Sequence, residues 1–513
     1  MPDPGDDKDA VIAELLEENR RLKAENELLR EKIDLILRKL HGPSSEKLDA
    51  KQLELLLDPD GAKKTCAAGC DEDAPAADSE SASPARRSGR RRPGLPADLE
   101  VVEEVVDPDD VLAQPEAWRQ LGQEVSERLE FEPARYWLRR IVRRTWVKRG
   151  EADLAPLTAP LAPCLLEGSL LSPSLAAGLL SAKFCEHQPF YRQEQKLSRR
   201  YEIEIARATM CHWAMVCADW LEPLYKLIAA ELRRQRWLQV DETPIDYLAP
   251  GHGRTKQGYL WTYHHPEVGV LYDWHPGRSH RCLDQILTDP HGGQDFRGVL
   301  LSDGYRAYDT WQRNHPEVLL AACWAHVRRK FHEAAAHHPA EAAAILKLIG
   351  ELFAVEQRLR NQRAGPDEIR IVRQQSSRPI VEQVQTRLTN LPHCVPTSTL
   401  AQARAYVFGL WDKLQVFLEH GAVPLHNNAV ENAIRPTKLG AKNWMFIGGA
   451  DTGQRSAVLY TFVENIRSAG ADPFAYLHDL FERLPAMTNQ DDLRPLLPRN
   501  WLARHSQPQS HVA

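Results

Sequence analysis

Three acids in this chain have types and surroundings suited to metal chemistry. Asp241 and Asp303 each end an apolar run that is typical of a buried strand, and Glu431 follows Asn427 and Asn428 in a helix-prone stretch. Carboxylates brought together from separate elements can hold hard divalent cations, and cations held in this way help to cut and join phosphodiesters. We therefore treat the three acids as candidate metal ligands and catalytic residues.

Other acids close to these three compete for the same role. Four of them are explained more simply by their expected positions: Glu242 on the opposite face of the strand, Asp309 at the surface, Asp451 in a flexible loop and Glu464 in a helix. Glu431 is preferred as the third acid because Arg435, Lys438 and Lys442 follow it on a basic face suited to DNA.

The elements that must position Asp241 and Asp303 alternate between strands and helices over residues 235–331. We expect a helix at 283–287 and strands at 237–247, 258–264, 268–274, 299–302 and 318–323. This β-β-β-α-β-α-β order is the ribonuclease-H-like layout. It places Asp241 on the first strand and Asp303 just past the fourth, side by side.

A long helical segment separates Asp303 from Glu431. Residues 332–422 are rich in Ala, Leu, Glu, Arg and Gln, which indicates an all-helical insertion into the core. Residues 423–490 then complete the core and carry Glu431, and residues 491–513 are expected to be a tail. The fold class is therefore multidomain α+β with a helical insertion.

Composition limits the class of protein. The chain has 513 residues, a net charge of −6, 43% hydrophobic residues and 27% charged residues, which is ordinary for a soluble multidomain protein. The acidic N-terminus is unlike a secretory leader, no apolar run is long enough to span a membrane, and the scattered cysteines fit a reducing compartment. We expect a cytoplasmic protein that does not bind membranes.

The N-terminal segment, residues 8–41, has the heptad pattern of a leucine zipper. Apolar residues occupy four successive d positions, Leu15, Leu22, Leu29 and Ile36, and asparagines stand at two a positions, Asn19 and Asn26. This pattern favours self-association as a two-stranded parallel coiled coil over an amphipathic helix packed on its own chain. A short helix and a disordered linker are expected over 42–98, where the arginines of 86–92 either contact phosphates or are solvated.

Two further modules are predicted between the linker and the core. Residues 99–155 form a small β unit whose interleaved arginines and aromatics suit either a DNA-backbone surface or a solvated face. Residues 165–234 are helical, with segments near 174–185, 191–200, 207–218 and 220–234. They fit a helix-turn-helix module that reads DNA with Arg207, Thr209 and His212, although plain helical bundles give similar patterns.

Cys323 and His326 have C-x2-H spacing after the second aspartate. A zinc site needs about four ligands and only two are visible, so a buried structural pair with a histidine hydrogen bond is favoured over zinc. Arg328 and Arg329, which follow them, are candidates for lining DNA together with Arg435, Lys438 and Lys442.

Several motifs occur in a fixed order along the chain: Asp241-Glu242-Thr243-Pro244, Ser302-Asp303-Gly304-Tyr305, residues 323–331, residues 427–431, Arg435-Pro436 and Lys442-Asn443-Trp444. Each motif alone is unspecific. In this order they resemble the transposases of the insertion-sequence 66 family, and the resemblance covers nearly the whole chain.

The resemblance implies a DDE transposase in which Asp241, Asp303 and Glu431 bind two Mg²⁺, with Mn²⁺ able to substitute. The expected partners are the terminal inverted repeats of a bacterial element, target DNA and possible accessory proteins of that element, with the protein on the nucleoid when bound. Relatives carry two cysteine pairs near the small β unit, whereas residues 105–150 have none here, so zinc is not expected there.

Two other functions remain open on the sequence. The chain could be a DNA-binding protein of the same origin without catalysis, or a structure-specific nuclease on the same fold. The presence of all three acids argues against a DNA-binding protein without catalysis. Binding to terminal repeats would distinguish a transposase from a structure-specific nuclease.

Overall fold

The computed structural model describes residues 95–96, 99–132, 135–149, 155–249, 251, 253–391, 396–488 and 490–505. They belong to one compact unit, Arg90–Ala513. The predicted coiled coil at 8–41 and almost all of the segment at 42–98 lie outside the described residues.

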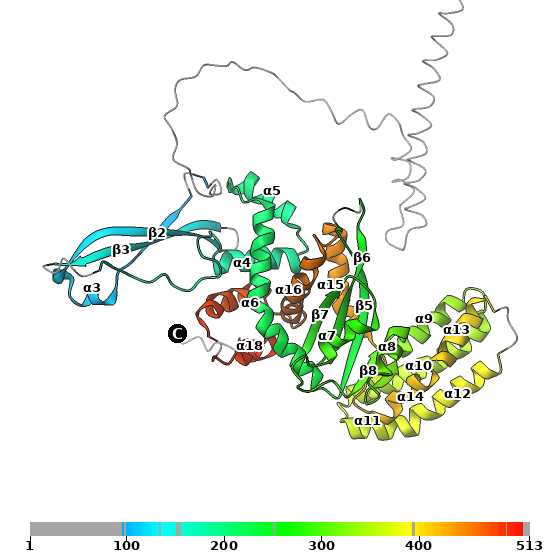
Figure 1. Ribbon diagram of the computed structural model, residues 1–513. Helices are drawn as coiled ribbons and strands as arrows, with labels where there is room; N and C mark the ends of the chain where they lie inside the picture. The colour runs from blue at the N-terminus through cyan, green and yellow to red at the C-terminus, as the bar shows by residue number, and fades with distance from the viewer. Residues whose placement is uncertain are drawn as a thin grey trace, which may run out of the picture. The chain divides into compact units, whose positions relative to one another are not determined.

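A five-stranded sheet in the order β7-β6-β5-β8-β9 forms the centre of this unit (Figure 1). Its strands are β5 (Trp237–Tyr247), β6 (Lys256–His265), β7 (Gly269–His275), β8 (Val299–Ser302) and β9 (Leu319–Ala322). β5, β6 and β7 are antiparallel, and β8 and β9 run parallel to β5. The predicted strands are confirmed to within about two residues at their ends.

Strand β8 is apolar for a physical reason. All four residues of β8 are buried, and helices α7 (Asp284–Leu287) and α8 (Arg306–Gln312) lie in the connections on either side of it. A strand covered on both faces has no solvent face, so its sequence is an uninterrupted apolar run. The apolar run is followed by Ser302 and then by Asp303, so the position of Asp303 can be recognised in the sequence.

The outer edge of β7 is covered by helix α16 (Ala450–Ser468). Backbone N–H groups on this edge donate to α16 side chains: Val270 to Asn465 (2.9 Å), Tyr272 to Thr461 (3.0 Å) and Trp274 to Gln454 (2.9 Å). Alternate residues of a strand present their N–H groups to the same side, so one helix satisfies three of them. Asp451, expected in a loop, lies in the first turn of this helix.

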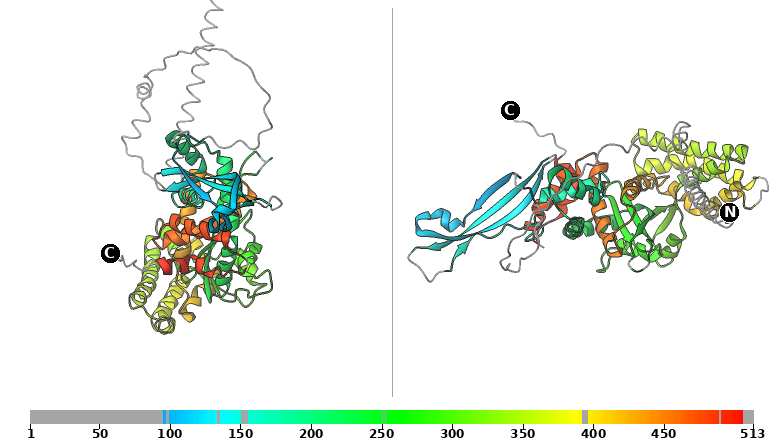
Figure 2. Two further views of the ribbon diagram at one scale, coloured as in Figure 1. Left: turned by 90° about the vertical axis from the view of Figure 1, so that its left-hand side faces the viewer. Right: turned by 90° about the horizontal axis from the view of Figure 1, so that it is seen from above.

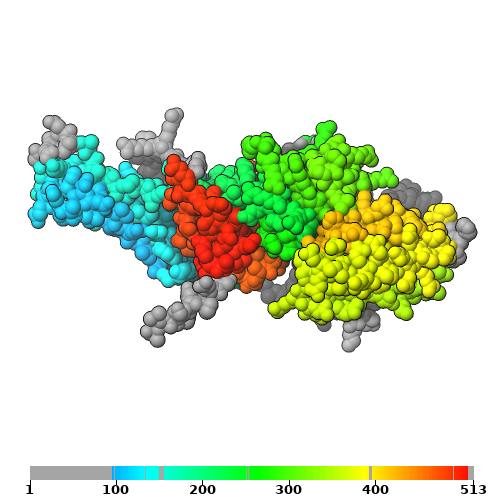
Figure 3. Space-filling view, turned by 90° about the horizontal axis from the view of Figure 1, so that it is seen from below, coloured from blue at the N-terminus to red at the C-terminus, as the bar shows by residue number. Residues whose placement is uncertain are grey.

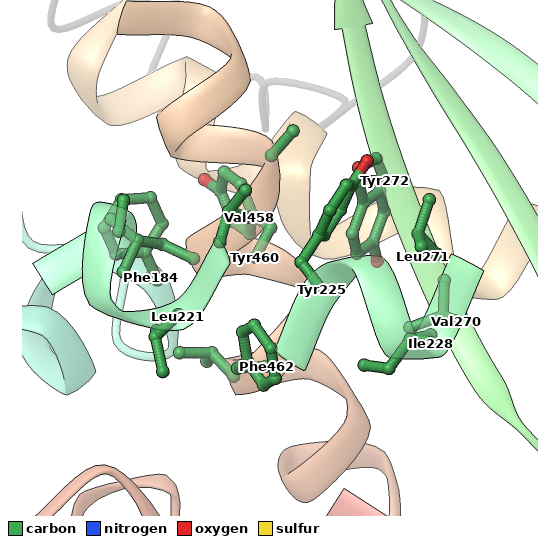
Figure 4. Packing of buried hydrophobic residues seen from close by; sticks show 14 of the residues in the cluster. Phe184, Leu221, Tyr225, Ile228, Val270, Leu271, Tyr272, Val458, Tyr460 and Phe462 are labelled. Atoms are coloured by element: carbon green, nitrogen blue, oxygen red, sulfur yellow. The ribbon is translucent and has the colours of Figure 1, made fainter. Parts of the chain in front are cut away.

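Five further helices pack around the side of the sheet formed by β7 and α16: α4 (Pro173–Phe184), α5 (Phe190–Tyr201), α6 (Arg207–Arg233), α17 (Pro473–Arg483) and α18 (Pro498–His505). Residues Leu221, Tyr225 and Ile228 of α6 pack with Tyr272 of β7 and Phe462 of α16 (Figure 4). The Tyr225 hydroxyl also donates to the Tyr272 carbonyl oxygen at 2.9 Å. This shared core ties the helices to the sheet.

Two predictions for these helices are wrong. The segments expected as separate helices at 207–218 and 220–234 form the single helix α6, which continues through Pro223 because the flanking Leu221 and Leu224 are fully buried. The predicted tail is folded as far as residue 505. Trp501 is buried against Tyr476, and that burial anchors α18.

The small β unit contains β1 (Val101–Val106), β2 (Trp118–Glu132), β3 (Arg135–Lys148) and β4 (Leu157–Thr158), with helix α3 (Asp109–Ala113). Its main sheet has the order β1-β3-β2, and β2 and β3 run side by side as a long hairpin (Figure 2). The arginines of β3 pair with acids: Arg135 with Glu100, Arg139 with Glu104, Arg140 with Glu127, Arg143 with Glu124 and Arg144 with Asp107. These pairs balance the basic charge, which weakens the case for a DNA surface.

The insertion between Asp303 and Glu431 is helical, as predicted. It contains α9 (Trp324–Ala334), α10 (Pro339–Asn361), α11 (Pro366–Val372), α12 (Arg378–Thr389), α13 (Thr399–Gly409) and α14 (Trp411–Glu419). These helices enclose a hydrophobic core of their own, and the yellow residues form one block in the space-filling view (Figure 3). α9 already belongs to this core through Val327 and Phe331, so the helical block begins before residue 332.

The two ends of the helical block meet at the sheet. The Trp324 backbone N–H donates to the Leu425 carbonyl oxygen at 3.1 Å, and the Asn427 N–H donates to Cys323 Sγ at 3.2 Å. The chain therefore leaves the end of β9 and returns to the same place about a hundred residues later. That return brings the following helix back to the sheet.

Candidate metal-binding active site

Strand pairing brings Asp241 and Asp303 together. In the parallel register of β5 and β8, Trp237 is opposite Val299 and Gln239 is opposite Leu301. Continued two residues past Leu301, this register puts Asp303 level with Asp241. The Tyr305 backbone N–H donates to Asp303 Oδ1 at 2.8 Å, which holds the carboxylate in the turn after the strand.

Glu431 reaches the same region from helix α15 (Asn428–Trp444), in whose first turn it lies. The buried side chain of Asn427, just before this helix, donates from Nδ2 to the carbonyl oxygen of Val240 at 3.0 Å. Val240 precedes Asp241, so this bond fixes the start of α15 beside β5. The structure thus places Asp303 and Glu431 close enough to Asp241 for their charges to interact with its carboxylate.

The electrostatics of Asp241 show how close these acids are. Burial raises its pKa to about 8, and the negative charges of Glu242, Asp303 and Glu431 add to the increase. Among the described residues, no lysine or arginine forms an ion pair with Asp241 or Asp303. A cluster of this kind stabilises a bound cation, because the cation relieves both the repulsion and the cost of burying the charge.

Glu242, the neighbouring acid, has its own ion-pair and hydrogen-bond partners. Its buried carboxylate pairs with Arg278 and accepts the Tyr308 hydroxyl at 2.5 Å on the other face of β5. Burial raises the pKa of Glu242, while the bonds from Tyr308 and Arg278 oppose that increase. The sequence prediction that Glu242 faces away from the site agrees with these contacts, although its two partners had no signal in the sequence.

The donor set fits a hard divalent cation. Asp241, Asp303 and Glu431 supply carboxylate oxygens, the ligands that Mg²⁺ prefers. Two buried oxygens next to them, Glu431 Oε1 and Asn427 Oδ1, have no hydrogen-bond partner within the described part of the chain. Buried polar atoms are normally satisfied, so these oxygens are available to an ion or its water ligands.

Glu431 also faces a histidine and an arginine of α9. Its Oε1 lies 3.7 Å from His326 Nδ1, and its Oε2 accepts from Arg329 Nη2 at 3.3 Å. The histidine hydrogen bond expected from the sequence is not found at Nδ1, which is buried without a hydrogen-bond partner among the described residues. Cys323 is fully buried next to them, as a structural cysteine would be.

The predicted DNA-contacting residues divide into two groups. Arg328, Arg329, Arg435 and Lys442 are exposed, and Arg329 also pairs with Glu431. Lys438 is half-buried and donates to the Pro244 carbonyl oxygen at 2.6 Å. The residues proposed for the reading helix lie at the start of α6, with Arg207 and His212 exposed and Thr209 half-buried. Sequence reasoning missed the tethering role of Asn427, although its place just before a helix and beside Asn428 is a visible signal.

Comparison with known proteins identifies the group to which this chain belongs. The sequence model described as "Transposase IS66 family" matches residues 168–455, more than half of the chain. The chain belongs to the IS66 transposase family. A second match, described as "Transposase C of IS166 homeodomain", covers residues 28–103 and so lies outside the predicted helix-turn-helix at 165–234.

Relatives of this IS66-family transposase include three proteins of Sinorhizobium fredii, each named only as uncharacterized. The protein y4jD is 31% identical over 93% of this chain and 94% of its own length. The proteins y4qI and y4hP are each 28% identical, over 81% and 92% of this chain and 78% and 88% of their own lengths. Within the described residues, no helix has the length and apolar character needed to cross a membrane.

Proposed function

We propose that this transposase cuts donor DNA and joins it to target DNA in a Mg²⁺-dependent DDE reaction. Asp241, Asp303 and Glu431 would hold two Mg²⁺, with Mn²⁺ able to substitute, on a core of the ribonuclease-H-like type. The observation that carries the proposal is the convergence of the three acids from β5, the end of β8 and α15. Burial raises the pKa of Asp241 to about 8, and the charges of Asp303 and Glu431 add to that increase.

The residues of this chain have defined tasks in such a reaction. The parallel pairing of β5 with β8 holds the two aspartates at a fixed spacing, and Asn427 keeps Glu431 beside them. Two bound Mg²⁺ would supply an activated water or DNA 3′-hydroxyl and stabilise the leaving oxygen. Rigid placement of the carboxylates matters because small errors in position lower the rate of in-line attack strongly.

Exposed basic residues near the acids would bind the DNA backbone. Arg328 on α9, and Arg435 and Lys442 on α15, are exposed on the two helices that face each other across Glu431 and His326. Arg435 lies one turn of α15 after Glu431, so a phosphate bound there would lie close to that carboxylate, and Lys442 would bind the backbone about three turns farther along. We further propose that the chain assembles through the heptads of 8–41 and binds terminal inverted repeats, with accessory proteins of the same element as possible partners.

A strand-transfer assay tests the proposal. The full-length protein, DNA carrying the terminal repeats of the element and a target plasmid are combined with Mg²⁺, and joined products are counted. Asp241→Asn is expected to lower joining by at least about 1,000-fold, because a ligand contributing several kcal/mol to metal-assisted catalysis is lost. Asp246→Asn is the matched control, since Asp246 is an exposed acid on the same strand.

The same experiment separates the alternatives. A protein that binds the repeats but never joins them with Mg²⁺ or Mn²⁺ is a DNA-binding protein without catalysis. A protein that cuts branched DNA equally well with and without the repeats is a structure-specific nuclease. Only joining that requires both the repeats and Asp241 agrees with the proposed function.

A further inference from the structure

The meeting of the two ends of the helical block creates a second cluster of possible metal ligands. Cys323 at the end of β9, His326 in the first turn of α9 and Glu431 in the first turn of α15 offer ligand atoms that all lie within 4.8 Å of one another. The ligands of one tetrahedral zinc ion are about 3.3 to 3.8 Å apart, given zinc bond lengths of roughly 2.0 to 2.3 Å. His326 Nδ1 and Glu431 Oε1, at 3.7 Å, already have that spacing.

These two atoms lack the partners that buried polar atoms normally have. Neither His326 Nδ1 nor Glu431 Oε1 forms a hydrogen bond within the described part of the chain, and both are buried. Leaving a buried polar atom unsatisfied costs about 1 to 3 kcal/mol. They face each other across a gap that is too long for a hydrogen bond and suitable for a shared ion.

The Cys323 sulfur lies where backbone N–H groups meet. It is the residue before helix α9, and its Sγ accepts the Asn427 backbone N–H at 3.2 Å. Burial raises the pKa of the Cys323 thiol to about 11, and the backbone N–H groups of Asn427, His326 and Ala325 offset only part of that increase. Donors at a helix start favour the anionic sulfur that a metal requires.

We propose that Cys323, His326 and Glu431 bind one Zn²⁺, with water as the fourth ligand. Sulfur and imidazole nitrogen are donors that zinc accepts and that Mg²⁺ disfavours, so this site selects a different ion from the three carboxylates. Binding releases the Cys323 thiol proton to solvent. The ion enters beside Glu431, whose side chain is 29% exposed, because Cys323 is fully buried.

The zinc site shares Glu431 with the proposed Mg²⁺ site. Zinc bound to Oε1 would hold the carboxylate toward α9 and compete with its role beside Asp241 and Asp303. Zinc is therefore expected to inhibit Mg²⁺-dependent joining at concentrations near its dissociation constant. This consequence rests on the proposed function, whereas zinc binding itself does not.

Cobalt binding tests the site directly. Co²⁺ is titrated into the full-length protein carrying Cys66→Ser and Cys70→Ser, which removes a pair of closely spaced cysteines that could bind the ion elsewhere. We expect one equivalent of Co²⁺ to produce the absorption band of a cobalt thiolate, and Zn²⁺ to displace it. Co²⁺ held only by carboxylates gives no such band, so the Mg²⁺ site does not contribute.

Variants decide which residues hold the ion. Cys323→Ser should abolish the band, and His326→Gln should weaken binding by at least about 100-fold, more than the loss of an outer-shell partner would. Cys211→Ser removes an exposed thiol elsewhere and should change nothing. Circular dichroism confirms that each variant is folded.

Three outcomes would overturn the proposal: no thiolate band with the parent protein, a band that survives Cys323→Ser, or full affinity in His326→Gln. If Cys323→Ser does not fold, His326→Gln still decides, because His326 is not part of the buried core. These measurements use no DNA and no Mg²⁺. A failure of the strand-transfer assay therefore leaves the zinc result standing, and the reverse also holds.

Discussion

Asp241 holds a proton more tightly in the folded protein than an ordinary aspartate does. Burial and the neighbouring acids raise its pKa from 3.8 to about 8. A group with a raised folded pKa stabilises the fold fully at low pH, and this stabilisation is lost as pH rises toward the folded pKa. The folded state without metal is therefore expected to lose stability between about pH 4 and pH 8.

Asp241→Asn should remove this part of the pH dependence. We expect the variant to match the parent near pH 4 and to exceed it by on the order of 2 kcal/mol near pH 8, because the amide is never charged. Thermal unfolding in EDTA at several pH values measures the difference. Addition of Mg²⁺ should raise the melting temperature of the parent at pH 8 and leave the variant nearly unchanged.

Equal pH profiles for the two proteins would contradict this account. Asp246→Asn is again the control, since an exposed aspartate should not alter the profile. The stabilisation by Mg²⁺ is a binding measurement and needs no DNA.

The predictability of the site differs from residue to residue. Asp241 and Asp303 could be predicted because each follows an apolar run and strand order alone makes the runs neighbours. Glu431 could be named only from its motif and from the basic residues that follow it, because nothing local in the sequence says that the chain returns to the sheet there. The bonds that bring it back, from Asn427 to Val240 and to Cys323, join residues 187 and 104 positions apart.

At the scale of elements, α16 and β7 depend on each other. Asn465 accepts the Val270 N–H, and its amide donates to the Val270 carbonyl oxygen at 2.7 Å. Gly269 is required beside it, because a side chain there would collide with Asn465 Oδ1. The helix thus supplies to the edge strand the hydrogen bonds that a further strand would otherwise supply.

Asn465→Leu should destabilise this region. The leucine has the same branching and number of heavy atoms as asparagine but leaves both polar groups of Val270 buried without partners, at a cost of about 2 to 4 kcal/mol. Urea unfolding followed by tyrosine and tryptophan fluorescence measures the loss. Ser468→Ala, an exposed change on the same helix, should stay within about 0.5 kcal/mol of the parent.

Hydrogen exchange provides an independent check on the same variant. Faster exchange of the Val270 amide is expected if the helix is what protects it. Unchanged protection would mean that α16 does not cover the edge in solution.

Elements were predictable where the local pattern was decisive. The strands of the sheet alternate or run apolar, and their positions were confirmed. The boundary inside α6 was wrong because Asp219 and Pro223 suggest a break that tertiary packing overrides. The ion pairs of β3 were missed because their acids come from β1, from the residues just before and after it, and from β2. Only strand pairing reveals which arginine meets which acid.

At the scale of the whole molecule, assembly is expected to depend on the N-terminal heptads. These residues lie outside the described part of the chain, so the proposal rests on their sequence. Leu22→Lys puts a charge at a d position and should dissociate the oligomer, because a lysine cannot be buried in a two-stranded seam without a large cost. Ala24→Lys, at an f position two residues later, should leave it intact.

Sedimentation velocity distinguishes the outcomes. The parent and Ala24→Lys should sediment as the same oligomer, with Leu22→Lys as a monomer at micromolar concentration. An unchanged oligomer in Leu22→Lys would place the self-association outside the predicted coiled coil. Joining activity of the monomeric variant would further show whether assembly is needed for transposition.

The covering of β7 has a consequence for how copies of this transposase can come together on DNA. An edge strand whose hydrogen-bonding groups already have partners offers no template to a strand from another chain. Copies held close together at the two ends of an element would therefore not fuse through β7 into a continuous sheet. Any contact between copies at this edge would then involve side chains alone and stay reversible.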